Sequence, residues 1–191
     1  MVPLASLRIE DDEEEPVNEG GKLETMRGPG VTAAVLTVSD GVRAGAREDT
    51  SGDTLEALLR DEGFEVVRRV VPDDAPLISA AIEELAEEGA LLVLTTGGTG
   101  FAPRDVTPEA TLSVVDREAP GIAEAIRADA ILRTPHALLS RGVAGLRGHA
   151  LVVNLPGSPG GCRDGFAVIG PALRHGLELA AGDTATAHEQ T

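Results

Sequence analysis

The residues best suited to chemistry lie in the stretch LTTGGTGFAPRDVTPEAT, which spans positions 94–111. Gly97, Gly98 and Gly100 allow positive φ angles and let backbone N–H groups come close to a ligand. The hydroxyls of Thr96 and Thr99 add donors suited to an anion. Phosphate is therefore the first ligand that this loop predicts, with an ordinary tight turn as the simpler alternative because short glycine motifs are common.

Three aspartates lie in the loops that come after apolar runs of the sequence: Asp40, Asp73 and Asp105. Carboxylates beside phosphate oxygens repel them unless a divalent cation lies between, and Mg²⁺ accepts a few carboxylates, substrate phosphates and waters. The combination predicts phosphoryl or nucleotidyl transfer. The motifs GxxxxGK[ST] and GxGxxG do not occur, so we expect neither a kinase-like site nor a dinucleotide site.

Each of these carboxylates also has a simpler explanation. Asp73 or Asp74 caps a helix, Asp40 shapes a turn, and Asp105 pairs with Arg104. Arg141, next to Ser140, either reaches an anionic substrate or ends a helix on the surface. Cys162 lies near a helix start, which lowers a thiol pKa, but a small buried core residue is the simpler interpretation.

The elements around these residues alternate between strand and helix. Apolar runs predict strands at 33–38, 64–71, 90–94 and 151–153, the last with a hairpin partner at 142–146. Apolar spacing predicts helices at 51–63, 77–85 and 120–132, and one that begins at Thr107 with a capping hydroxyl. Ser158 followed by Pro159 marks a further helix start. This order indicates a three-layer α/β/α fold with a mostly parallel central sheet.

Four unusual loops leave the carboxyl ends of the predicted strands, at residues 39–41, 72–74, 95–105 and 154–159. In open α/β sheets the ligand crevice lies outside these strand ends. The loops bring hydroxyls, glycine N–H groups and carboxylates to one edge, which favours a ligand site over a plain turn.

The chain as a whole has 191 residues, a formal net charge of −16 and one cysteine. We expect an acidic, disordered arm at 1–30, one folded domain at 31–182 and a flexible tail at 183–191. The negative charge argues against nucleic-acid binding, and no apolar run reaches membrane-spanning length. A lone cysteine suits a reducing cytoplasm.

The motifs together resemble the MogA/MoaB family, the molybdopterin adenylyltransferases of molybdenum cofactor biosynthesis. In order along the chain they read VSD at 38–40, VPDD at 71–74, the glycine stretch at 94–111, APG at 119–121, LSR at 139–141 and NLPGSP at 154–159. The resemblance runs from about Thr32 to Gly182. It implies a trimeric homo-oligomer that joins AMP from Mg-ATP to molybdopterin, releases pyrophosphate and hands its product to a molybdenum insertion protein.

The resemblance also implies residue roles. Asp73 and Asp105 match the functional aspartates, which would act in catalysis and hold Mg²⁺. The residues that match substrate-binding positions are Ser39, Asp40, Thr96, Gly97, Gly98, Thr99, Gly100, Ser140, Asn154, Pro156, Gly157 and Ser158. The competing hypothesis is a scaffolding member that binds the pterin with little or no turnover.

Overall fold

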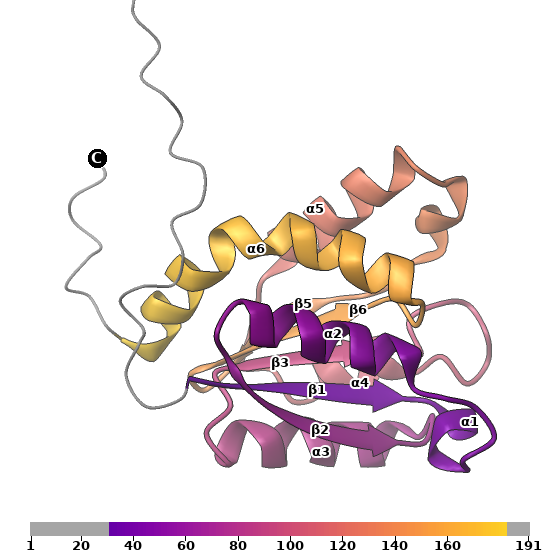
Figure 1. Ribbon diagram of the computed structural model, residues 1–191, viewed down its shortest axis with the longest axis horizontal. Coiled ribbons are helices and arrows are strands. Elements are labelled where there is room, and N and C mark those ends of the chain that lie inside the picture. Colours follow the sequence, from indigo (N-terminus) through magenta and orange to yellow (C-terminus); the bar gives the residue numbers. More distant parts are fainter. Residues whose placement is uncertain (1–30, 183–191) are drawn as a thin grey trace, which may run out of the picture.

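The computed structural model describes residues 31–182; the predicted arm at 1–30 and tail at 183–191 lie outside this range. The elements follow the predicted alternation of strand and helix (Figure 1). They are β1 (Thr32–Val38), α1 (Asp40–Arg43), α2 (Thr50–Asp61), β2 (Glu65–Val71), α3 (Ala75–Glu87), β3 (Leu92–Thr96), α4 (Thr107–Leu112), β4 (Arg117–Glu118), α5 (Pro120–Ile131), the 3₁₀ helix η1 (Pro135–Leu139), β5 (Ala144–Arg147), β6 (Ala150–Leu155) and α6 (Pro159–Ala181).

The six strands form one sheet in the order β2-β1-β3-β6-β5-β4. Strands β2, β1, β3 and β6 are parallel, while β5 runs antiparallel to both β6 and β4. The hairpin of β5 and β6 turns at Gly148, where φ is +55°. The mostly parallel sheet and the hairpin predicted from the sequence are therefore both confirmed.

Apolar side chains alternate between the two faces of the sheet, as the pleat of a strand requires. Ala33 and Val35 on β1 belong to the core formed with α2, α5 and α6, whereas Ala34 and Leu36 belong to the core formed with α3 and α4. Figure 1 shows α2, α5 and α6 on one side of the sheet and α3 on the other. This is the predicted three-layer arrangement, and it buries both faces of the central strands.

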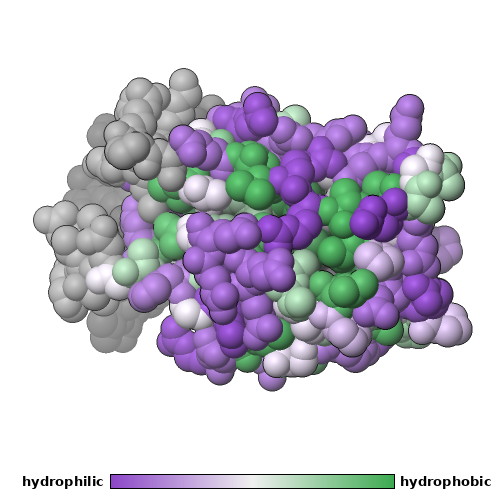
Figure 2. All heavy atoms as spheres, turned by 90° about the horizontal axis from the view of Figure 1, so that it is seen from below, coloured by the Kyte–Doolittle hydropathy of each residue, from purple (hydrophilic) through white to green (hydrophobic). Residues whose placement is uncertain are grey.

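The face that carries α3 is covered mainly by hydrophilic residues, with hydrophobic ones visible between them (Figure 2). Helix α3 explains this pattern, because Ile78, Ile82 and Leu85 are buried against the sheet while its glutamates lie outward. No helix among residues 31–182 is long and apolar enough to cross a membrane.

Two helix starts behave as the sequence predicts. The Asp74 carboxylate accepts a hydrogen bond from Leu77 N at 3.2 Å and caps α3. The Ser158 hydroxyl accepts one from Gly161 N at 3.2 Å and caps α6, with Pro159 in the first turn. These caps define where α3 and α6 begin, and they therefore hold the ends of the loops after β2 and β6 in place at the sheet edge.

Cys162 is the chain's one cysteine and is fully buried in the first turn of α6. Its thiol donates to Pro156 O at 3.2 Å and lies 3.4 Å from the Thr96 hydroxyl. Burial raises the pKa of Cys162 to about 11, which outweighs the opposing effect of the Thr96 hydrogen bond. The interpretation as a small buried core residue is confirmed, and the thiol is not activated by the helix start.

We therefore expect Cys162 to report unfolding. At pH 8 the thiol of the native protein is both protonated and covered, so iodoacetamide should leave it unmodified for hours, while the guanidinium-unfolded chain should react fully. Mass spectrometry of samples quenched across a denaturant series measures the modified fraction. Rapid labelling of the native protein at pH 8 would contradict this placement of the thiol.

Candidate ligand site at the carboxyl edge of the sheet

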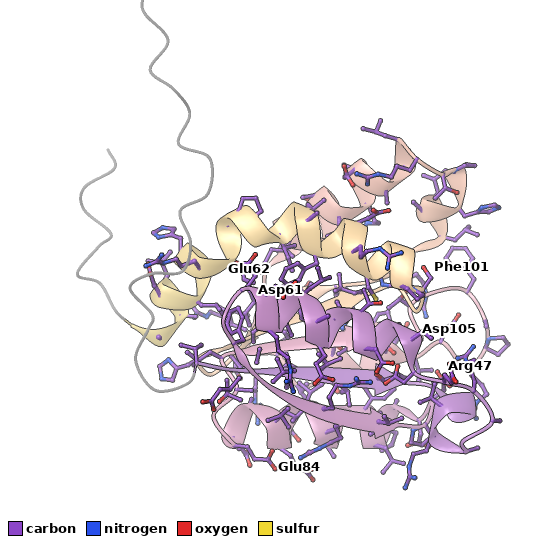
Figure 3. The ribbon with its side chains drawn as sticks, in the orientation of Figure 1. Arg47, Asp61, Glu62, Glu84, Phe101 and Asp105 are labelled. Carbon is purple, nitrogen blue, oxygen red and sulfur yellow. The ribbon has the colours of Figure 1, made fainter. Side chains whose placement is uncertain are left out.

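The loops after β1, β2, β3 and β6 meet at one edge of the molecule, as the parallel strands require. Figure 3 shows Arg47, Phe101 and Asp105 at the end where these strands finish, while Asp61 and Glu62 lie at the far end of α2. The loops after β3 and β6 touch, because Gly97 N donates to Leu155 O at 3.4 Å. The edge predicted to hold a ligand is thus formed by adjoining loops.

The glycine loop, residues 97–100, has a backbone that only glycine adopts without strain. The φ angle is +102° at Gly97 and +64° at Gly98. A Cβ at Gly97 would lie 2.3 Å from the carbonyl oxygen of Val38, and one at Gly98 would lie 2.3 Å from the Thr107 hydroxyl. The loop therefore lies directly against the end of β1 and the start of α4, and both glycines are needed there.

Thr107 has a structural role other than the predicted helix cap. Helix α4 begins with Val106 in the capping position and no side-chain cap, so the prediction of a Thr107 cap was wrong. The Thr107 hydroxyl instead donates to Gly97 O at 2.9 Å, and its backbone N–H donates to Gly98 O at 3.0 Å. The residue is fully buried and holds the glycine loop against α4.

Arg141 clamps the other side of the loop. Its backbone N–H donates to Thr99 O at 2.9 Å and its Nε donates to Gly100 O at 2.8 Å. Its two terminal nitrogens donate to Asp105 O and to the Glu109 carboxylate. Through these bonds Arg141 holds the glycine loop in place.

Asp40 and Asp73 join the loops after β1 and β2 by reciprocal hydrogen bonds. Asp40 N donates to Asp73 Oδ2 at 2.8 Å, and Asp73 N donates to Asp40 Oδ1 at 3.1 Å. Arg104 donates to both Asp40 oxygens, at 2.9 Å and 2.7 Å, and holds the pKa of that carboxyl below its usual range, helped by the Asp73 N–H. The alternative in which Arg104 pairs with Asp105 is therefore wrong: Asp40 shapes this junction and is the residue that Arg104 binds.

Asp73 and Asp105 border the glycine loop from two sides. A Cβ at Gly98 would lie 3.4 Å from Asp73 Oδ1, and a Cβ at Gly100 would lie 2.9 Å from Asp105 Oδ2. Asp105 Oδ2 accepts from Ala102 N at 2.8 Å, which orients the carboxylate. Each aspartate keeps one oxygen that makes no hydrogen bond within residues 31–182, Oδ1 in both cases.

The two free carboxylate oxygens of Asp73 and Asp105 are donors of the kind that fits Mg²⁺. Carboxylate oxygens are the protein ligands that Mg²⁺ prefers, and it usually completes its shell with substrate phosphates and waters. Within the described part of the chain, no three His, Cys, Asp or Glu side chains are grouped to hold a metal by themselves. A magnesium ion between Asp73 and Asp105 would thus depend on the phosphates of a substrate for the rest of its ligands.

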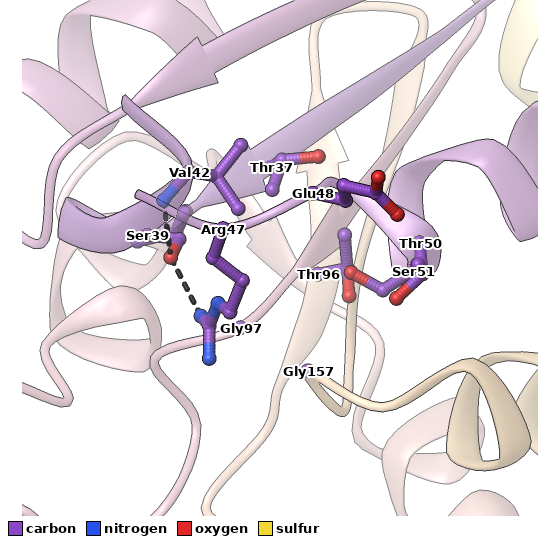
Figure 4. A pocket seen from close by; sticks show the side chains of 11 residues that line it. Thr37, Ser39, Val42, Arg47, Glu48, Thr50, Ser51, Thr96, Gly97 and Gly157 are labelled. Carbon is purple, nitrogen blue, oxygen red and sulfur yellow. Dashed lines mark hydrogen bonds between the residues drawn. The ribbon is translucent and has the colours of Figure 1, made fainter. Parts of the chain in front are cut away.

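A pocket of about 350 Å³ lies beside the glycine loop, and we call it the Ser39 pocket (Figure 4). Its walls come from the ends of β1, β3 and β6 and from the segment before α2. Its polar lining includes Thr37, Ser39, Arg47, Thr50, Ser51 and Thr96. Arg47 is the only cation in the lining, and it donates to Ser39 Oγ at 2.7 Å. Because Ser39 Oγ also accepts from Val42 N at 3.3 Å, its own proton remains available to a ligand.

A second pocket of about 420 Å³, the Ser140 pocket, opens on the other side of the loops after β3 and β6. Thr99, Gly100, Ser140, Pro156 and Ser158 line it together with parts of α5, η1 and the start of α6. Its exposed lining is mainly apolar, unlike that of the Ser39 pocket. The two pockets share the glycine loop and the loop after β6 as their common wall, which suits two ligands that react with each other.

Most predicted site residues fall into one of these groups. Ser39, Thr96, Gly97 and Gly157 line the Ser39 pocket. Gly98 belongs to the glycine loop, Asp73 and Asp105 lie beside that loop, and Asp40 is hydrogen-bonded to Asp73. The remainder line the Ser140 pocket, except Asn154.

The side chain of Asn154 forms hydrogen bonds within the fold, and substrate binding at this residue stays a prediction. The residue is buried, and its amide nitrogen donates to the hydroxyls of Thr95 at 3.0 Å and Thr111 at 2.9 Å. Its amide oxygen accepts from Val143 N at 3.2 Å. With these bonds formed, the side chain joins β3, β5 and α4 behind the pockets.

Sequence reasoning missed Arg47 and Asp49. Arg47 lies in a segment without periodicity, so nothing in the sequence indicates that it folds back onto Ser39. Asp49 caps α2 by accepting from Gly52 N at 3.0 Å, and the preference of aspartate for this position would have located it.

The fold and the site define a class of protein: a three-layer α/β domain with a phosphate-suited glycine loop at the carboxyl edge of a parallel sheet. Residues 34–175 match the family described as "Probable molybdopterin binding domain" (MoCF_biosynth), and the chain belongs to this family.

Relatives and solved structures agree with this assignment. The chain is 38% identical over 156 residues to the molybdenum cofactor synthesis protein cinnamon of Drosophila melanogaster, covering 80% of this chain and 26% of that protein. It is 45% identical over 129 residues to a molybdopterin adenylyltransferase of Haemophilus influenzae, covering 65% of this chain and 66% of that one. The crystal structure of the molybdopterin biosynthesis enzyme MoaB from Thermus thermophilus superposes with a TM-score of 0.74 at 47% identity, covering 80% of this chain and 97% of that chain. The chain thus spans about a quarter of the first relative's length and just under two thirds of the second's.

We expect Gly97→Ala to distort the site where Gly89→Ala does not. Gly89 has nearly the same φ, +96° against +102°, but a Cβ there would meet nothing within 4 Å. Both variants place an alanine at a strained positive φ, and only Gly97→Ala adds a collision with the Val38 carbonyl. Its unfolding free energy should therefore fall by a further ~1–3 kcal/mol. Equal losses in urea denaturation of the two variants would show that the loop does not press against β1.

Proposed function

We propose that this chain is a molybdopterin adenylyltransferase that transfers AMP from Mg-ATP to molybdopterin and releases pyrophosphate. The observation that carries the proposal is the placement of Asp73 and Asp105 beside Gly98 and Gly100 of the glycine loop, which forms part of the wall of both pockets. The name of the Haemophilus influenzae relative supports the same activity.

The reaction needs two substrates held so that their reacting atoms meet. An oxygen of molybdopterin attacks the α-phosphorus of ATP, the bond from that phosphorus to the bridging oxygen breaks, and pyrophosphate leaves. The shared wall of the two pockets, formed by the glycine loop and the loop after β6, would hold the reacting groups in line. The substrate-binding roles of Ser39, Asp40, Thr96–Gly100, Ser140 and Pro156–Ser158 belong to this proposal.

Bound magnesium would neutralise phosphate charge as it builds up in the transition state. Asp73 and Asp105 would hold the ion through their Oδ1 atoms. The Arg104 bond to Asp40 and the reciprocal bonds between Asp40 and Asp73 keep the Asp73 backbone in place for this task. Arg47 offers a positive charge to a phosphate in the Ser39 pocket.

We further propose a trimer that works in the cytoplasm and passes its product to a molybdenum insertion protein. Support for an interface comes from the segment 131–139, where Ile131, Leu132, Leu138 and Leu139 expose 40–86% of their surface. Apolar side chains gathered in this way are typical of contact surfaces. The buried, unpaired Cys162 suits a reducing compartment.

Asp105→Asn should separate catalysis from pterin binding. The change keeps the shape and can still accept from Ala102 N, but it removes the charge that offsets the cation. Turnover should fall on the order of 100-fold or more, with molybdopterin affinity nearly unchanged. Asp74→Asn is the matched control, because asparagine also caps α3 and the residue lies on the surface, so its turnover should equal that of the wild type. Loss of pterin binding in Asp105→Asn, with transfer to the bound fraction intact, would refute the metal role.

The assembly state has its own test. Sedimentation velocity of the full chain over a range of concentrations should give one species at three times the monomer mass of 19.6 kDa. Leu132→Asp and Leu138→Asp should shift that species toward the monomer, since each places a charge in an apolar contact. A monomer at all concentrations would contradict the proposed trimer.

A further inference from the structure

Arg68 lies on the edge strand β2, outside every motif of the sequence, yet it reaches the back of the Ser39 pocket. Its side chain lies on the α2 face of the sheet and is 24% exposed. The guanidinium binds the carboxylate of Asp49, and it also donates to Asp53 at 2.7 Å and to Glu56 at 2.8 Å. One arginine thus joins the edge strand to three acidic groups at the start of α2.

Asp49 connects this arginine to the pocket wall. Its Oδ2 accepts from the Thr37 hydroxyl at 2.7 Å as well as from Arg68, while its Oδ1 accepts from Gly52 N at 3.0 Å. Thr37 and Ser51 both line the Ser39 pocket, as do the neighbours of Asp49 in the chain, Glu48 and Thr50. The orientation of this wall therefore depends on where the Asp49 carboxylate is held.

The space around this connection is filled. A Cβ at Gly52 would lie 2.4 Å from Arg68 Nη2, 2.4 Å from Asp49 Oδ2 and 2.7 Å from Thr37 Oγ1. No side chain fits between the arginine and the helix, so the guanidinium presses directly on the first turn of α2. Because these groups are tightly packed, a movement of Arg68 also moves Asp49.

Arg69, the next residue, provides an internal comparison. It lies on the opposite face of β2 and binds Glu84 at 2.7 Å and Glu88 at 3.0 Å, both of which are more than half exposed. Arg68 instead leaves its Nε buried without a hydrogen-bond partner in the described chain. A buried unpaired donor costs free energy, which offsets part of what the ion pairs of Arg68 contribute to stability.

We propose that Arg68 is a positioning residue of the Ser39 pocket, which fixes Asp49 and, through it, the Thr37 and Ser51 hydroxyls that face the ligand. For its role in turnover this inference rests on the proposed AMP transfer. The positioning itself is a property of the ligand-free protein and is measured separately.

The test compares Arg68→Met, Arg68→Lys, Asp53→Asn and Arg69→Met in the full chain. In the ligand-free protein, the Gly52 amide should exchange with solvent about tenfold faster in Arg68→Met, because Asp49 loses its anchor. Arg69→Met should leave the exchange rate of the Gly52 amide unchanged, because Arg69 binds residues of α3. Asp53→Asn should also leave it unchanged, because Asp53 is an exposed partner of Arg68 that does not line the pocket.

Steady-state assays with molybdopterin and Mg-ATP give the second measurement. Arg68→Met should raise the KM of one substrate about tenfold with kcat within a factor of about three, since misplaced hydroxyls weaken binding of the ligand in that pocket. Arg68→Lys should recover part of this loss, because lysine keeps the charge near Asp49 but lacks the fork of donors. Arg69→Met should match the wild type in both constants.

The outcomes distinguish the two claims. Unchanged Gly52 exchange in Arg68→Met, or equal effects of Arg68→Met and Arg69→Met, would overturn the positioning role whatever the activity. Faster exchange together with the KM change supports it. If the wild-type protein does not transfer AMP, the proposed function is refuted. The role of Arg68 is then still decided by the exchange rate of the Gly52 amide and by the molybdopterin affinity of the same variants, measured by calorimetry.

Discussion

The close approach of the glycine loop to the end of β1 sets the geometry on which the rest of the site depends. With Gly97 directly against the Val38 carbonyl, the loop after β3 cannot move toward β1, and it divides the sheet edge into two pockets. Thr107 and Arg141 hold the loop from α4 and from the segment before β5. The loop is thus fixed by hydrogen bonds to its own carbonyls, which leaves the side of the loop that faces the pockets free for a ligand.

At this edge arginines pair with some of the carboxylates, while Asp73 and Asp105 form no ion pair within residues 31–182. Arg104 is bound to Asp40, and Arg141 to Glu109 and backbone carbonyls, so both guanidinium groups already have partners within the described chain. Arg47 remains at the Ser39 pocket, and Asp73 and Asp105 remain beside the glycine loop. The carboxylates of Asp73 and Asp105 would repel a free anion. An anion that carries a bound metal ion suits this site better, because the metal offsets that repulsion.

The sequence was sufficient for the order of the longer elements and for the edge at which the loops meet, because apolar runs and glycines report local backbone preferences directly; the short elements α1, β4 and η1 were not predicted. It could not show contacts between residues far apart in the chain. The partners of Asn154 and the pairing of Arg104 with Asp40 depend on how strands are ordered in the sheet, and the bond of Thr107 to Gly97 depends on how the segment between β3 and α4 folds back. Thr107 and Arg104 had been given local roles from their neighbours, and Asn154 a role from the family resemblance, whereas packing gave each of them a structural partner. Arg68 belongs to the same group, since its strand carries no motif.

The most direct test of the account follows the AMP group itself. The full chain, incubated with molybdopterin, Mg²⁺ and ATP labelled at the α-phosphate, should yield labelled pterin product and unlabelled pyrophosphate in equal amounts, with neither formed when Mg²⁺ is chelated. Tight binding of molybdopterin without any labelled pterin, under each divalent ion tried, would contradict the account and identify the protein as a pterin-binding scaffold.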